Sequence, residues 1–548
     1  MRWTLFLLLA VACGTGRPGT DAPVGGRTLL QTGAEGLRAI RPEALRAHVL
    51  FLADDALEGR APGSAGHRIA ARYVTTQLAA LGLEPAGERG GFEQAVPLRS
   101  MVRDDADSSL EVDGKPVAPG NVILPPFASR VDVKGPLVYG GYGITAPDQK
   151  YDDAAGADLH GAIAVVMRGA PPSFAPPTAR ALYSDFELKA ERLAARGAAA
   201  VIVVVTPEGE KQRPWAQRQA DSRFESMVWM NGDRPGSGPT IPVAIVNMAG
   251  LQVLLGDGDA AALWSEAAAG RARPRKLGKA AHLRIASTYR DLSSSNVAAV
   301  LPGGDPALAG EYVVFTAHLD HLGVGTPVAG DAIYNGALDD AVGVAALLEI
   351  ARAFASMPVK PPRSLLFLTV TAEEEGLLGS DYYAHHPTVP IRSIVADVNL
   401  DAPNPLYEMF DTVPLGAAHS SLRRNVDEAA AALKIAVSED PVPEQGFFIR
   451  SDQYSFVKQG VPSIFPLAGE RDASGSTKRN HAIFEGWMAK HYHQPSDEWR
   501  DGEYGADWLA KEVRLDFLIG LSIARAPARP AWNAGDVFAA TFAAAGAR

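Results

Sequence analysis

The chain has 548 residues, of which 47% are hydrophobic and 21% are charged, a composition typical of a globular protein with more than one domain. Its formal net charge is −11, and no block of basic residues offsets the acidic excess. Proteins contact nucleic acid mainly through clustered lysine and arginine. We therefore expect no nucleic-acid partner.

Residues 1–13 have the composition of an export signal. Arg2 gives a basic start, and an apolar run then ends at Ala12. The run is about half of the ~20 residues that a membrane span needs, so it predicts a cleaved signal peptide. Cys13, the one cysteine of the chain, lies in "AVAC", which resembles a bacterial lipobox, although Ala10 stands where leucine is more usual. We expect an exported protein, periplasmic or at the cell surface, anchored to a membrane by a lipidated Cys13 or, alternatively, simply secreted.

The segment after the signal predicts a tether and then helices. Residues 14–37 are rich in Gly, Thr and Pro and predict a flexible tether. Two helices are expected over about 40–84, the second from about Gly66 with apolar residues at helical spacing and an end before Gly82. The sequence "EGRAPGS" between them predicts a turn-rich loop.

A separate α/β pattern occupies residues 119–285. Short apolar strands are expected in "GPLVYGGYG", "GAIAVVMRG", "AAAVIVVVTP" and "IPVAIVN", around one amphipathic helix, "FELKAERLAARG". Residues 207–239 are polar and irregular, and they are long enough for a functional loop. No cluster of catalytic residue types falls in this block.

From about residue 290, short apolar strands alternate with expected helices. The helices are predicted over 340–356, from 376, over 416–434 and over 505–525. This alternation predicts an α/β/α sandwich with a mixed, largely parallel central sheet. The block at 119–285 is then a smaller domain inserted into a discontinuous larger domain. The larger domain is predicted at 38–118 and 286–530, and a C-terminal tail at 531–548.

Several expected strands end in residue types that bind metal ions. Open α/β sheets place their sites at the carboxyl ends of strands. Buried carboxylates are too costly to leave ionised alone, so they pair or coordinate a metal. The pattern therefore predicts a metal site at one sheet edge. The candidates are His318 and Asp320 in "VVFTAHLDHLG", Asp339 and Asp340 in "NGALDDAVG", Glu373 and Glu374 in "FLTVTAEEEG", Asp401 in "VADVNLDAP" and His493 in "HYHQPSDEW".

Taken singly, these residues have simpler interpretations. Asp340 could merely cap the helix that follows it. His318 alone would be an ordinary strand-end histidine, and Asp401 alone a turn former. Five further residues are interpreted as surface residues or as supports of the ligands: Glu375, His321, His385, His386 and His491.

Together, "HLDHLG", "NGALDDAVGVAALLEIARAF", "TAEEEGLLGSDYY", "NLDAP" and "YHQPSDEW" resemble the motifs of the co-catalytic zinc metallopeptidases of clan MH. That family includes aminopeptidase Y, aminopeptidase S and the relatives of glutamate carboxypeptidase II. The likeness covers about 40–115 and 290–525, in matching order. The block from "YGGYGI" through "KAERLAARGAAAVIVV" resembles a protease-associated (PA) domain.

The resemblance implies two Zn²⁺ ions per chain, bridged by Asp339. One ion would be completed by His318 and Asp401, the other by Glu374 and His493. Each ion would have one imidazole, one carboxylate of its own and half of a shared carboxylate, a set suited to Zn²⁺ with room for water. A bridge of this kind holds two metals ~3.5–4 Å apart with one hydroxide between them.

The resemblance also assigns roles beside the metals. Glu373 would be the general base that takes a proton from the bridging water and passes it to the leaving amine. Asp320 would orient the ring of His318. The chain departs from the family where "RSDQYSF" has Gln453 in place of a common histidine. That position is not a ligand, so the departure concerns only the lining of the substrate cleft.

We therefore expect an exported, zinc-dependent metallo-exopeptidase, a hydrolase that acts on peptides as an aminopeptidase. The motifs supply carboxylates that suit the ammonium of a substrate, whereas Arg450, the nearest cation for a substrate carboxylate, stands alone. Three alternatives share the scaffold: a carboxypeptidase, a glutaminyl-cyclase-like acyltransferase with one zinc, and a receptor-like binding protein with eroded ligands. The chain has no G-x-x-x-x-G-K-[ST], G-x-S-x-G or H-E-x-x-H motif, so other hydrolase and nucleotide chemistries lack residues to carry them.

Overall fold

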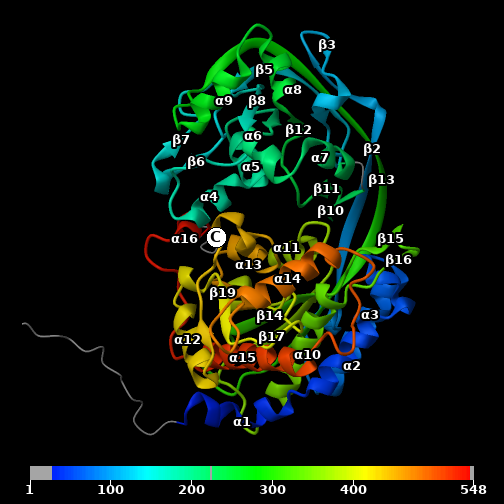
Figure 1. The fold of residues 1–548 in the computed structure, drawn as a ribbon, viewed down its shortest axis with the longest axis vertical. Coiled ribbons are helices and arrows are strands. Elements are labelled where there is room, and N and C mark those ends of the chain that lie inside the picture. The colour runs from blue at the N-terminus through cyan, green and yellow to red at the C-terminus, as the bar shows by residue number, and fades with distance from the viewer. Residues whose placement is uncertain (1–26, 223–224, 543–548) are drawn as a thin grey trace, which may run out of the picture.

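The computed structural model describes residues 27–222 and 225–542, which form two lobes (Figure 1). The predicted export signal at 1–13, with Cys13, and the first part of the predicted tether lie outside the described residues. Within the described ranges, we find no helix with the length and hydropathy needed to traverse a bilayer.

The larger lobe, at the bottom of Figure 1, is built on a mixed sheet. Its central strands β17, β14, β18 and β21 are parallel neighbours, while β13 joins one side and β19 the other in antiparallel pairing. The predicted α/β sandwich with a largely parallel sheet is confirmed. In chain order the strands are β1 (Glu84–Pro85), β13 (Arg275–Leu301), β14 (Tyr312–His318), β17 (Ser364–Val370), β18 (Ile394–Asn399), β19 (Asp411–Leu415), β20 (Ala436–Val437) and β21 (Ser463–Ala468).

Helices cover both faces of this sheet. Phe315 of β14 lies on the first face, in one buried cluster with Phe354 and Phe517 of its helices, and Val314 faces the opposite way toward Tyr383 and Phe456. This alternation is what a strand buried on both faces requires. The first face carries α1 (Leu29–Ala39), α2 (Pro42–Leu52), α3 (Ala65–Ala80), α10 (Val342–Ala355), α12 (Leu422–Leu433) and α15 (Ala506–Arg525), and the second carries α11 (Leu378–His385) and α13 (Gln453–Lys458).

The first helix corrects the predicted tether, which is wrong for residues 29–37. Thr28 and Gln31 form a capping box at the start of α1, and Leu29 is buried. A Cβ added to Gly36 would lie 2.3 Å from the ring of Phe517. The glycine that suggested flexibility therefore allows close packing on α15, and this burial outweighs the low helix propensity of glycine.

The smaller lobe contains the inserted block. The four apolar segments expected as strands form β5, β8, β9 and β12, and the expected amphipathic helix forms α5. The neighbours β5–β8, β8–β9 and β9–β12 are parallel. In chain order, elements of the smaller lobe include β4 (Val122–Ile123), β5 (Val131–Tyr139), β8 (Ile163–Met167), α4 (Pro177–Ser184), α5 (Phe186–Ala195), β9 (Ala200–Val204), β12 (Val243–Val246), α8 (Met248–Leu255) and α9 (Ala260–Ala268).

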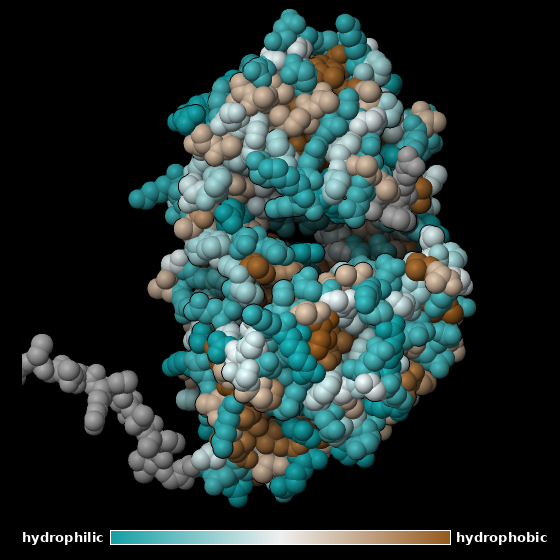
Figure 2. Space-filling model, in the orientation of Figure 1, coloured by the Kyte–Doolittle hydropathy of each residue, from teal (hydrophilic) through white to brown (hydrophobic). Residues whose placement is uncertain are grey.

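Long strands and buried side chains join the two lobes. Strands β2 (Glu93–Val112) and β13 pair along their lengths and run through both lobes, at the right of Figure 1, so the predicted boundary at 285/286 lies inside β13. Elsewhere, Tyr183 of α4 shares a buried cluster with Phe448, Tyr454 and Phe538, the last from α16 (Val537–Phe542). Figure 2 shows that the surface is hollowed between the lobes.

Residues 207–239 are mostly regular, so the prediction of an irregular loop is wrong. They contain α6 (Pro207–Gln212), α7 (Trp215–Asp221), β10 (Ser226–Asn231) and β11 (Arg234–Pro235). Strand β10 pairs with β2, with Trp229 opposite Leu98. A neighbouring strand far away in sequence supplies its hydrogen bonds, which local polarity could not reveal.

Candidate metal centre

The five predicted metal ligands converge at the carboxyl edge of the larger sheet. His318 ends β14, Glu374 follows β17 and Asp401 follows β18. Asp339 lies in the short helical segment η5 (Ala337–Ala341) that precedes α10, and His493 follows α14 (Lys478–Lys490). Parallel strands end at the same edge, so residues that are distant in sequence meet there.

The carboxylate of Asp339 lies between two imidazoles. Its Oδ1 is 3.1 Å from His318 Nε2, and its Oδ2 is 3.1 Å from His493 Nε2. His318 Nε2 is also 3.7 Å from Asp401 Oδ1, and His493 Nε2 is 3.1 Å from Glu374 Oε2. Adjacent ligands of a tetrahedral Zn²⁺ with bonds of about 2.0–2.1 Å are about 3.3 Å apart. These distances fit two ligand sets that share Asp339.

Two atoms of the cluster are buried without a hydrogen-bond partner. They are His493 Nε2, despite its contacts with two carboxylates, and Glu374 Oε1, although the ring nitrogen Nδ1 of His321 lies 2.6 Å away. Buried polar atoms are normally satisfied, and nitrogen and oxygen donors of this kind are the ligands that Zn²⁺ prefers. The donor set therefore fits a divalent cation.

The surroundings of the adjacent glutamates Glu373 and Glu374 shift their pKa values differently. Burial and the charge of Asp339 raise the pKa of Glu374, but His321 and His493 outweigh them and bring that pKa to about 2. Burial holds the pKa of Glu373 well above its ordinary value, and the charges of Asp401 and Glu374 add to this against His318. The pKa values of these two carboxylates, adjacent in sequence, are therefore shifted in opposite directions.

Asp340 accepts a backbone N–H of the first turn of α10 and two N–H groups from elsewhere at the site. Its Oδ1 accepts the N–H groups of Gly343 at 3.0 Å and Ala402 at 2.8 Å, and its Oδ2 accepts that of His318 at 3.2 Å. The carboxylate therefore ties the start of α10 to the loops that carry two of the predicted ligands. A Cβ at Gly343 would lie 1.9 Å from the carbonyl oxygen of Leu400, so this close approach requires glycine.

Asp320, predicted to orient the ring of His318, contacts that ring through its backbone. The ring Nδ1 of His318 lies 3.2 Å from the backbone carbonyl oxygen of Asp320. The carboxylate of Asp320 instead accepts the backbone N–H of Glu373 at 3.2 Å. The contact of Asp320 with the ring of His318 therefore comes from its backbone, while its side chain turns toward the loop that follows β17.

His321 is a support of the cluster rather than a surface residue. It is fully buried, and its Nδ1 lies 2.6 Å from Glu374 Oε1. Its ring centroid is 5.8 Å from that of His493. The available signal was its place in "HLDHLG", next to two predicted site residues. Four further residues are interpreted from the sequence as surface residues or as supports of the ligands. His385 contacts Asp381, His491 contacts Ser496, and His386 packs on Trp229. Glu375 is partly buried, and burial together with the charge of Asp320 raises its pKa to about 7.

Arg60, in the "EGRAPGS" loop, is a site residue that was not predicted from the sequence. It is 1% exposed and donates to four backbone carbonyls, including those of Leu319 at 2.9 Å, Asn335 at 2.6 Å and Gly336 at 3.0 Å. Burial lowers its pKa to about 10, against the charges of Asp320 and other carboxylates. The guanidinium therefore joins two loops that carry predicted ligands. No sequence motif around Arg60 predicts this role.

A chain of hydrogen bonds supports Asp401. Ser451 Oγ donates to Asp401 Oδ2 at 2.6 Å, and Asn399 Nδ2 donates to Ser451 Oγ at 2.7 Å and to Gln453 Oε1 at 2.8 Å. Gln453 is fully buried and donates to the carbonyl of Phe448 at 2.7 Å. The residue that departs from the family pattern thus belongs to this network and does not line a cleft. Arg450 is exposed over the ring of Phe447.

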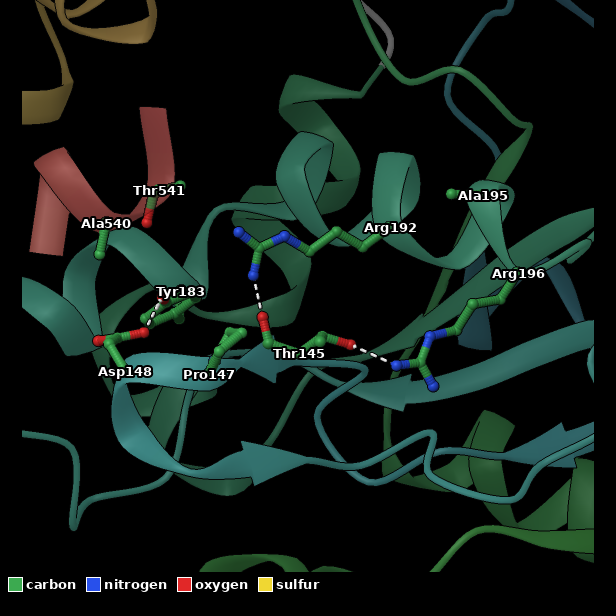
Figure 3. Close-up of a pocket in the computed structure, with 9 residues that line it drawn as sticks. All are labelled: Thr145, Pro147, Asp148, Tyr183, Arg192, Ala195, Arg196, Ala540 and Thr541. Atoms are coloured by element: carbon green, nitrogen blue, oxygen red, sulfur yellow. Dashed lines mark hydrogen bonds between the residues drawn. The ribbon is translucent and has the colours of Figure 1, made fainter. Parts of the chain in front are cut away.

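A cavity of about 300 Å³ lies elsewhere, between α5 and α16 (Figure 3). Its polar groups already bond to one another: Tyr183 donates to Asp148, and Arg192 and Arg196 donate to Thr145. None of its lining residues belongs to the predicted site. They are Thr145, Pro147, Asp148, Tyr183, Arg192, Ala195, Arg196, Ala540 and Thr541.

The fold and the ligand cluster define a class, an α/β sandwich with a candidate two-metal centre and an inserted α/β domain. Residues 296–518 match the model of peptidase family M28, and residues 133–254 match that of the PA domain. The larger lobe thus contains a segment that matches peptidase family M28, and the inserted block contains a segment that matches a PA domain. The predicted resemblance to zinc metallopeptidases with such an insert is confirmed.

Curated relatives match over parts of their length. A probable leucine aminopeptidase 2 of Aspergillus oryzae is 29% identical over 193 residues, 33% of this chain and 35% of the relative. That of Aspergillus fumigatus is 26% identical over 371 residues, 65% of this chain and 59% of the relative. The matches therefore span less than two thirds of these relatives. An aminopeptidase structure from Aneurinibacillus sp. strain AM-1 aligns with a TM-score of 0.49 and 20% identity over 91% of this chain and 97% of that chain.

Proposed function

We propose that the protein is a zinc-dependent metallo-exopeptidase that removes N-terminal residues from peptides. The observation that carries the proposal is the carboxylate of Asp339, shared between His318 and His493 at 3.1 Å each. The membership of residues 296–518 in a peptidase family supports a hydrolase. The relatives named leucine aminopeptidase support the choice of the N-terminus.

The residues would hold two Zn²⁺ ions. His318 and Asp401 would hold one, Glu374 and His493 the other, and Asp339 would contact both. When bound, such ions polarise a scissile carbonyl and lower the pKa of coordinated water. His321 would keep Glu374 oriented, since its Nδ1 lies 2.6 Å from that carboxylate.

Glu373 would act as the general base. Its backbone is held by Asp320, and its carboxylate makes no hydrogen bond among the described residues, which leaves both oxygens for water. It would take a proton from the attacking water and deliver it to the leaving amine. Its raised pKa makes it a carboxylate able to hold that proton between the two steps.

The polarity of the site favours a free amine in the substrate. Glu373 and Asp401 offer carboxylate oxygens to an ammonium, a charge-assisted arrangement. Arg450, the cation considered for a substrate carboxylate, is exposed and lies over Phe447. We therefore assign the protein to aminopeptidases rather than to carboxypeptidases.

The test compares an aminoacyl arylamide with its N-acetylated form, after reconstitution with zinc and metal analysis. We expect hydrolysis of the free-amine substrate, little or none of the blocked one, and two metal equivalents per chain. Comparable rates on both, or release of a C-terminal residue from an N-blocked peptide, would assign a carboxypeptidase or endopeptidase. One zinc per chain with cyclisation of an N-terminal glutamine would assign a glutaminyl cyclase. Metal binding without turnover of any of these would leave a receptor-like protein.

We also propose that the protein is exported and held to a membrane by acyl chains on Cys13. The support is the basic start, the short apolar run and the single cysteine of residues 1–13. Cys13→Ser should release or misprocess the protein. Wild-type protein recovered wholly in the soluble fraction, with a mature start beyond residue 13, would instead indicate a plain signal peptide.

A further inference from the structure

The inserted segment 207–239 contacts the larger lobe through Trp229 of β10. Its indole Nε1 donates a hydrogen bond of 2.8 Å to Asp381 Oδ2, across 152 positions of sequence. Trp229 is 2% exposed and Asp381 5% exposed. Asp381 lies on α11, the helix that directly follows the turn carrying Glu373 and Glu374.

The indole ring also packs around that turn. Trp229 shares one buried cluster with Ala372, which precedes Glu373, and with Leu378, the first residue of α11. Its ring centroid is 5.3 Å from that of Tyr382 in an edge-to-face arrangement. One side chain of the inserted domain thus belongs to the buried cluster that includes both ends of the turn.

The turn depends on its surroundings for its shape. Ala372 and Leu377 have φ values of 57° and 61°, in the left-handed region that residues with a Cβ rarely adopt. Inside the turn, Gly376 and Leu378 donate to the carbonyls of Glu373 at 2.8 Å and Ala372 at 2.9 Å. Residues with a Cβ keep a left-handed backbone conformation only where the surrounding packing holds them in it.

The contact between Trp229 and Asp381 is held from both sides. Lys458 Nζ of α13 donates to the other carboxylate oxygen, Asp381 Oδ1, at 2.5 Å. On the far side of the indole, a Cβ added to Gly236 would lie 1.8 Å from the Trp229 ring. Glycine therefore lets the chain after β11 close over the indole. Trp229 has little room to take another position.

We propose that Trp229 is a positioning residue for catalysis: it fixes the turn that presents Glu373 and Glu374, so that the inserted domain helps to align the general base. This inference rests on the proposed function, because it assigns no chemistry of its own to Trp229. Small displacements of a catalytic group cost turnover steeply, since the reacting atoms must be aligned. The inserted domain then acts on kcat, and not only on substrate access.

The test compares Trp229→Phe with the matched variant Trp215→Phe. Trp215, on α7 of the same inserted segment, also donates through its indole, but to the carbonyl of Gly120 at 2.7 Å rather than to a residue of α11. We expect Trp229→Phe to lower kcat on an aminoacyl arylamide at least tenfold, with KM within about twofold of wild type and zinc content unchanged. Trp215→Phe should match wild type. Unchanged kcat in Trp229→Phe, or an equal loss in both variants, would overturn the inference.

Hydrogen exchange supplies a readout that does not depend on activity. Backbone amides of residues 372–382 should exchange faster in Trp229→Phe than in wild type or Trp215→Phe, and equal exchange in all three would overturn the inference. If wild type hydrolyses no arylamide, the proposed function fails while this measurement still tests the positioning. If Trp229→Phe does not fold, Asp381→Asn weakens the same contact and should give a smaller kcat loss in the same direction. Where both single variants fold, the variant with both Trp229→Phe and Asp381→Asn should lose no more kcat than the more affected single variant. Additive losses of kcat would contradict a shared contact.

Discussion

Arg60 donates a hydrogen bond of 2.9 Å to the backbone carbonyl of Leu319, a residue 259 positions away that lies between His318 and Asp320. The same guanidinium bonds the carbonyls of Asn335 and Gly336, just before Asp339. A single buried cation therefore sets the distance between two loops that carry predicted ligands.

Arg60→Met should destabilise the larger lobe strongly. The substitution leaves four buried carbonyls without their donor, which we expect to cost roughly 3–5 kcal/mol. The melting temperature should fall well below that of Arg68→Met, a control whose side chain bonds the carbonyl of Gly63 at an exposed position. Equal melting temperatures would mean that the carbonyls find other donors.

Glu373→Gln should retain the metals and the fold but lose on the order of 10²–10⁴ in turnover, the usual range for one general base. Glu374→Gln should instead release one metal, because it removes a ligand. Metal analysis by mass spectrometry and kcat measured on the same samples separate the two effects. Equal zinc loss in both variants would contradict the division of roles between the neighbours.

Ser451→Ala should weaken the binding of the metal that His318 and Asp401 would hold. Ser451 donates to Asp401 Oδ2 at 2.6 Å, and loss of such a support typically costs 10–100-fold in metal affinity. Zinc retention against a competing chelator measures the effect. Ser455→Ala is the control, since Ser455 is also buried but pairs with Ser380 at 2.9 Å. Unchanged zinc retention in Ser451→Ala would remove Ser451 from the site.

Lys189 predicts a pH dependence of stability. Burial lowers its pKa from 10.5 in the unfolded chain to about 7 in the folded protein. The cost of burying the charge is therefore fully present below about pH 7, and it disappears as the pH rises toward 10.5. Lys189→Met should raise the melting temperature more at pH 6.5 than at pH 9.5, whereas Lys276→Met, at an exposed position, should show no such difference. A rise in the melting temperature of Lys189→Met that grew with pH would contradict a lowered pKa of Lys189.

Much of the architecture could be predicted because its signals are local. The alternation of apolar strands and helices predicts the sandwich, and strand-end motifs place His318, Glu374 and Asp401 at one sheet edge. The resemblance to clan MH peptidases adds Asp339 and His493, which the structure brings to the same edge. Two local signals misled. Glycines in α1 suggested a tether although they serve packing on Phe517, and the polarity of residues 207–239 hid a strand that forms only against β2.

The sequence by itself determined which residue types reach the sheet edge, since strand ends are encoded by local hydrophobic runs. Only the tertiary structure decided how those residues are supported. It turned the carboxylate of Asp320 toward Glu373, buried His321 against Glu374, and brought Trp229 to Asp381. Each of these contacts joins segments far apart in the chain. Their geometry depends on the register and packing of whole elements, which no short stretch of sequence specifies.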